Sequence, residues 1–158
     1  MQELAIGSGS FYAAFGSKKA LYLRCLERCT AFQCGSLETS CEGTAELRPA
    51  VRSLLTSLIE ADLADPTRGC LVVNASTPCG GMPTATDRVT IAIRRVESFL
   101  ARALERAQAQ GELSPEKDPR ELARFLTTFV HGIRVVGRAR MGRQFAEDAL
   151  SVAMRALG

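Results

Sequence analysis

The chain has 158 residues, of which 46% are hydrophobic and 23% are charged, the balance of one ordinary globular domain. Its net charge of +3 permits binding to nucleic acid but is far from the basic excess that would by itself indicate it. No apolar run approaches the length that spans a bilayer and no signal peptide opens the chain, so we expect a cytoplasmic protein without membrane contact.

The first structured stretch indicates a very short helix followed by a tight break. Bulky rings at Phe11, Tyr12 and Phe15 suit a helix with one buried face, and we expect Phe11 and Phe15 to lie in the core. The next two residues break that helix. The second of them, Ser17, is a good N-cap for a longer helix that begins at Lys18.

Helical spacing of apolar residues predicts that nearly all of the remaining chain is α-helical. The predicted helices cover residues 18–35, 45–63, 85–110, 119–138 and 144–157. Residues 71–73 have the composition of a strand, but an isolated strand would have no partner, so we predict a short helix there. Residues 78–83 are predicted to form a loop.

The cysteines are expected to be reduced residues that pack like small apolar side chains. In helix 18–35 the predicted apolar stripe consists of Leu21, Cys25, Cys29 and Phe32. The chain has six cysteines, but no secretory context and no common zinc-site spacing accompanies them. We therefore expect packing cysteines and no metal site.

The two C-terminal helices have broad apolar faces. Asp118 precedes the first of them as an N-cap, Pro119 takes its first position and Glu121 its third, which is a clean helix start. The apolar faces of both helices are wider than one core contact needs. They predict association with a second copy, with a fully intramolecular bundle as the alternative.

The N-terminal layout resembles the end of the recognition helix in the TetR family of bacterial transcriptional regulators. Tyr12, Phe15, Ser17 and Lys18 match the family's motif in order. The segment Gly-Cys-Leu-x-x-Asn at residues 69–74 is similar to one branch of the family. The resemblance spans the chain and implies an all-α protein. The resemblance further implies that the chain consists of a partial helix-turn-helix DNA-binding domain at residues 1–35 and an effector-binding and dimerisation domain at residues 36–158.

The same resemblance implies DNA-contacting residues. Tyr12 is similar to the family tyrosine that contacts a phosphate, with core packing as the alternative, and Lys18 resembles a lysine that reaches the same backbone. Ser8, Ser10 and Ala13 lie where side chains of the family face base edges. Because these three residues are small, we expect little direct reading of bases from this helix.

The function implied by the resemblance is an effector-responsive transcriptional regulator, a repressor, that acts as a homodimer on operator DNA. In the family a full first helix and a whole second helix precede the motif, whereas residues 1–5 precede it here. We therefore predict that this chain dimerises but binds DNA weakly or not at all. The alternative is a dimeric ligand-binding module with impaired DNA binding. No pattern indicates an enzyme, and we expect no catalytic residue and no cofactor.

The resemblance also places an effector pocket and a dimer interface. A small, unidentified effector is expected among the middle helices, next to residues that are otherwise plain core: Leu58, Cys70, Asn74, Thr77, Val96, Phe99, Phe129 and His131. Cys70 is alternatively a sensing thiol, if it is exposed and acidic, and His131 a hydrogen-bonded core or interface residue. The implied dimer interface consists of Leu126, Val130, Ile133, Phe145, Leu150, Val152, Ala153 and Leu157.

Overall fold

The computed structural model describes residues 7–42, 46–65, 69–76 and 83–158, and for 32–34, 36–42 and 83–85 it describes the backbone alone. This part of the chain is all-α, as expected, and has no strand. Its helices are α1 (Ser8–Phe15), α2 (Lys18–Glu42), α3 (Leu47–Ala64), α4 (Leu71–Ser76), α5 (Pro83–Ala109), α6 (Pro119–Arg138) and α7 (Arg143–Leu157). No helix within the described ranges combines the length and the hydropathy needed to cross a membrane.

Two helix starts confirm the capping residues expected from the sequence. Asp118 Oδ1 accepts a hydrogen bond from the backbone N–H of Arg120 at 2.8 Å, which fixes the first turn of α6. Ser17 Oγ accepts from the backbone N–H of Ala20 at 3.0 Å and starts α2 in the same way. The short helix predicted over 71–73 is confirmed as α4.

The end of α2 differs from the sequence-based prediction. The helix was expected to end near residue 35 but continues to Glu42, so the predicted boundary between residues 35 and 36 falls inside a continuous helix. A glycine inside a helix costs only about 1 kcal/mol, and contact along α5 can offset that cost. Of the loop predicted over residues 78–83, residues 78–82 lie outside the described part of the chain, and Pro83 is already the first residue of α5.

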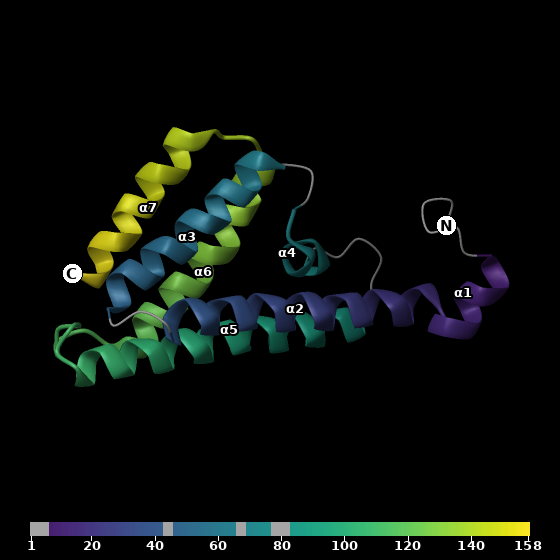
Figure 1. The fold of residues 1–158 in the computed structure, drawn as a ribbon, viewed down its shortest axis with the longest axis horizontal. Helices are drawn as coiled ribbons and strands as arrows, with labels where there is room; N and C mark the ends of the chain where they lie inside the picture. The colour runs from purple at the N-terminus through teal and green to yellow at the C-terminus, as the bar shows by residue number, and fades with distance from the viewer. Residues whose placement is uncertain (1–6, 43–45, 66–68, 77–82) are drawn as a thin grey trace.

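The helices form an elongated arrangement around one long pair (Figure 1). α2 and α5 lie side by side along much of the molecule, with α1 at one end of α2. α3, α6 and α7 pack together at the other end, and α4 contacts α2, α5 and α6. α1 is therefore far from the bundle of α3, α6 and α7, and α4 lies between that bundle and α2.

The apolar interior is divided into two clusters that share α5. The larger cluster joins α3, α5, α6 and α7, and its most deeply buried side chains include Leu55, Leu100, Leu104, Leu126 and Met154. The smaller cluster joins α2, α4 and α5 through Leu26, Cys70, Val72, Val89 and Ala92. Burial of this apolar surface is the main favourable contribution to folding.

The buried face of α2 is one position away from the predicted stripe. Cys25 is exposed and Cys29 is half-buried, whereas Leu26 and Thr30 are buried. The Thr30 hydroxyl donates to the carbonyl oxygen of Leu26 at 2.8 Å, so a polar side chain is satisfied inside the interface. The packing role predicted for Cys25 is therefore wrong. The side chain of Phe32 lies outside the described residues.

Candidate functional site

α1 and the first residue of α2 present to solvent the side chains that the family resemblance assigns to DNA. Ser8, Ser10, Ala13 and Lys18 are exposed, and Tyr12 is 48% exposed. This exposure argues against core packing as the role of Tyr12. The hydroxyl of Tyr12 and the ammonium group of Lys18 are both able to reach an anionic partner.

The rings of α1 attach this helix to the protein. Phe11 is buried, as predicted, and Phe15 is half-buried; their ring centroids lie 5.3 Å apart. Gly16 ends the helix at φ +72°, a conformation that favours glycine, and its N–H donates to the Tyr12 carbonyl oxygen at 2.8 Å. Among the described helices α1 contacts α2 alone, so its position depends on that one neighbour.

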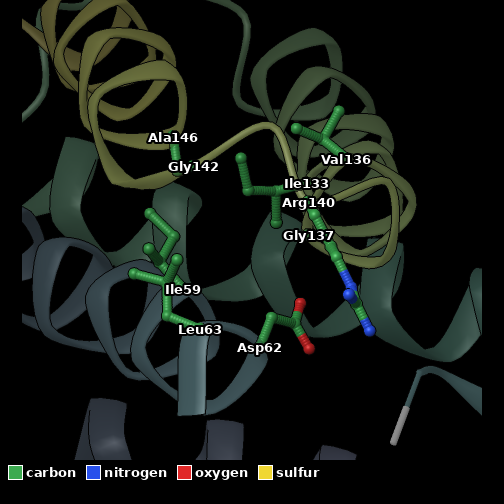
Figure 2. A pocket seen from close by; sticks show the side chains of 9 residues that line it. All are labelled: Ile59, Asp62, Leu63, Ile133, Val136, Gly137, Arg140, Gly142 and Ala146. Atoms are coloured by element: carbon green, nitrogen blue, oxygen red, sulfur yellow. The ribbon is translucent and has the colours of Figure 1, made fainter. Parts of the chain in front are cut away.

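A pocket of about 240 Å³ lies between α3, α6 and α7. Its lining residues are Ile59, Asp62, Leu63, Ile133, Val136, Gly137, Arg140, Gly142 and Ala146. Figure 2 shows the Asp62 carboxylate and the Arg140 guanidinium on one side of the pocket and Ile59 and Leu63 on the other. Because a cavity of roughly 150 Å³ holds benzene, this pocket has room for about ten non-hydrogen atoms.

The carboxylate at this pocket belongs to a buried ion pair. Arg134 Nη1 lies 2.7 Å from Asp62 Oδ1, and the two side chains are only 10% and 7% exposed. Arg134 Nη2 also donates to the carbonyl oxygen of Gly69 at 3.1 Å. Arg134 Nε is buried and has no hydrogen-bond partner within the described ranges. The Asp62 charge is thus compensated, and the pocket is connected to the start of α4.

A second arginine also joins α6 to α4. Arg138 Nη1 donates to Oδ1 of Asn74 on α4. In contrast, Cys70 and Val72 join α4 to α2 and α5 by apolar packing. α4 is therefore joined to α2 and α5 by apolar packing, and α4 and the residue Gly69 before it are joined to α6 by hydrogen bonds from two arginines.

The turn between α6 and α7 forms the rim of the pocket. Arg140 has a φ of +57°, which is rare for a residue with a Cβ, and Gly142 has a φ of +89°. Arg143 Nη2 donates to Oε2 of Glu60 at 2.9 Å, so the start of α7 is held against α3. This hydrogen bond, assisted by the Arg143 charge, holds the pKa of Glu60 below its ordinary value.

The predicted effector residues that the structure describes do not line this pocket. Val96 and Phe99 are buried in the larger apolar cluster, and Leu58 and Phe129 are half-buried against it. Cys70 is buried in the smaller cluster, so it lacks the exposure that a sensing thiol needs. The pocket is lined by other residues of α3 and α6 than those predicted, and it includes α7.

Three further predicted effector residues have other surroundings. Asn74 is bonded to Arg138 at the surface, and Thr77 lies outside the described residues. His131 is half-buried, and its Nε2 has no hydrogen-bond partner in the part of the chain that the structure describes. Neither Asn74 nor His131 lines the pocket, whereas the sequence analysis missed Asp62 and Arg140, which do.

Most of the predicted interface residues are covered within the protomer. The covered side chains are Leu126, Ile133, Leu150, Ala153 and Leu157. Since a buried side chain cannot meet a second copy, these five are corrected to core residues. Val130 is half-buried, and Phe145 and Val152 are exposed as an interface requires.

α6 approaches α3 so closely at the pocket that replacing Gly137 by alanine would require the backbone or Asp62 to move. A Cβ at Gly137 would lie 2.8 Å from Asp62 Cβ, closer than real Cβ contacts. We expect Gly137→Ala to lower the free energy of unfolding by about 1 to 3 kcal/mol, as overpacking does. Urea unfolding measures this change in the free energy of unfolding. Gly35→Ala is the control, because its Cβ meets nothing within 4 Å and alanine should stabilise that helix.

Comparison with known proteins identifies the family to which the chain belongs. Residues 43–156 match the family model described as "Tetracyclin repressor-like, C-terminal domain". A cysteine mutant of the TetR family transcriptional regulator CifR, solved with operator DNA, is 27% identical with a TM-score of 0.87; the match covers 99% of this chain and 83% of CifR. A comparison with curated proteins finds no match.

Two further solved structures show the same fold. The regulatory protein TetR from Rhodobacter sphaeroides has a TM-score of 0.88 at 21% identity, over 99% of this chain and 85% of that one. Reduced NemR from E. coli has a TM-score of 0.78 at 22% identity, over 99% of this chain and 82% of that one. The fold similarity therefore spans α1 as well as the C-terminal helices.

Proposed function

The chain belongs to the TetR family of DNA-binding transcriptional regulators, which are not enzymes, and on that premise we propose that it is an effector-responsive repressor acting as a homodimer on operator DNA. The observation that carries the proposal is the likeness to CifR, which was solved with operator DNA and matches 99% of this chain. The exposed side chains of α1 agree with it.

In this proposal α1 binds the DNA backbone more strongly than it reads bases. Tyr12 donates its hydroxyl to a phosphate, and Lys18 provides a cation at the first turn of α2, where backbone N–H groups favour an anion. Ser8 and Ser10 offer only short polar side chains to the base edges. Because α1 contacts α2 alone among the described helices, the second candidate is a dimeric ligand-binding module with impaired DNA binding.

The proposed dimer interface is the exposed apolar surface of α6 and α7. Of the seven large apolar side chains that are exposed in the described ranges, five lie on these helices or in their connecting turn: Phe125, Val135, Met141, Phe145 and Val152. Phe145 and Val152 are two helical turns apart and so share one face of α7. A concentration of exposed apolar side chains on two adjacent helices favours association.

The pocket between α3, α6 and α7 is the proposed effector site. A molecule bound there contacts Asp62, whose partner Arg134 also holds the Gly69 carbonyl oxygen next to α4. α4 packs on α2, and α2 carries α1. A shift of Arg134 is thereby able to change the position of α1 and the spacing of the two DNA-binding helices in a dimer.

A mobility-shift titration at several salt concentrations tests DNA binding, with the DNA upstream of the protein's own gene as probe. Lys18→Ala is expected to weaken binding several-fold and to reduce the slope of log K against log salt by about one, because one phosphate contact is lost. Arg106→Ala is the matched control, since Arg106 is exposed at the far end of α5. Absence of any shift at low salt would favour the ligand-binding module instead.

A further inference from the structure

We propose that the pocket between α3, α6 and α7 takes a neutral, mostly apolar molecule that donates one hydrogen bond to the Asp62 carboxylate. The inference deepens the proposed function, because it names the chemical class of the effector. Three properties of the pocket carry it: its size, its apolar wall, and the charges that face it.

The size and the wall require a compact apolar body. The pocket of about 240 Å³ is bounded by Ile59, Leu63, Ile133, Val136 and Ala146. Removing apolar surface of a ligand from water against this wall supplies most of the binding free energy. A molecule carrying several polar groups would lose hydration there without finding partners.

The charges at the pocket select against ions. An ionised carboxylate only accepts hydrogen bonds, so a ligand group that contacts Asp62 has to be a donor. Arg134 at 2.7 Å already compensates the Asp62 charge, and Arg140 adds a further positive charge, so a cationic ligand gains no net attraction. Arg140 is exposed, so water and salt screen its attraction for an anion, and an anionic ligand next to the apolar wall would lie against the Asp62 carboxylate. Arg143 and Glu60, at the start of α7 and on α3, compensate each other.

A neutral donor matches every one of these constraints. It places one O–H or N–H on the carboxylate, leaves the Asp62–Arg134 pair intact and brings no charge into the apolar wall. Primary alcohols, phenols and secondary amides are the simplest members of this class.

A matched series of probes tests the inference by calorimetric titration of the intact chain. The probes are 1-octanol, heptyl methyl ether, octylammonium and heptanoate, which have the same number of non-hydrogen atoms and differ in donor capacity and charge. We expect 1-octanol to bind and the ether to bind at least about tenfold more weakly, since the ether lacks the hydrogen bond to a charged acceptor. Both ions are also expected to bind at least about tenfold more weakly, because each brings a charge out of water and against the apolar wall. Equal binding of alcohol and ether, tighter binding of either ion, or no binding of the alcohol would overturn the inference.

Substitutions that leave the ion pair intact locate the binding. Val136→Phe fills the pocket and is expected to reduce 1-octanol binding by at least about tenfold. Ile91→Phe is the control, because Ile91 is exposed on α5 away from the pocket and should bind 1-octanol unchanged. If Val136→Phe binds the alcohol as the parent does, the site is wrong. The mobility shift without any ligand separates this outcome from failure of the proposed function, which would show as loss of operator binding.

Discussion

Asp62→Ala is expected to lower the free energy of unfolding by about 3 to 5 kcal/mol, because it leaves the Arg134 guanidinium buried without its counter-ion. Arg134→Leu is expected to lower the free energy of unfolding by a similar amount, because it leaves the Asp62 carboxylate buried without the Arg134 charge. It also removes the hydrogen bond to the Gly69 carbonyl oxygen. Urea unfolding followed by circular dichroism measures both variants.

The double variant Asp62→Leu with Arg134→Leu distinguishes the pair from general core damage. Removing both charges together leaves neither uncompensated, so we expect it to be more stable than either single variant. The control is the exposed pair of Glu60 and Arg143, where Glu60→Ala should change stability far less. Single variants at Asp62 and Arg134 that unfold like the parent would contradict a structural role for this pair.

Val152→Asp is expected to convert the dimer into monomers at micromolar concentration. A carboxylate placed on the exposed apolar face of α7 would have to be buried without a partner when two copies associate. For a residue near the centre of an interface this costs about 2 kcal/mol or more, which raises the dissociation constant by about thirtyfold. Sedimentation velocity over a dilution series measures the change.

The control for the dimer prediction is Ile91→Asp. Ile91 is exposed to nearly the same extent as Val152 but lies on α5, outside the proposed interface. It should therefore leave the association unchanged. A parent chain that sediments as a monomer at all concentrations, or equal dissociation of both variants, would argue against an interface formed by α6 and α7.

The buried position of Asp62 and its need of a partner were accessible to sequence reasoning, but the identity of that partner was not. Asp62 follows Leu58 by four residues and Ile59 by three, so it continues the apolar stripe of α3 as a charged side chain. A charge in such a position signals a buried partner. The identity of that partner was inaccessible, because Arg134 lies on a different helix and no local pattern connects the two.

The sequence by itself determined the helices and the family. Helical spacing of apolar residues, Ser17 and Asp118 as caps, and the ordered motif of α1 depend on neighbours within a few residues, and such local interactions are visible in a linear chain. Only the tertiary structure decided which apolar faces are covered. Leu126 is buried and its neighbour Phe125 is exposed, a difference that depends on where α5 packs against α6. Apolar character predicts that a side chain will be covered, but the packing of distant helices decides whether the cover comes from the same chain or from a partner.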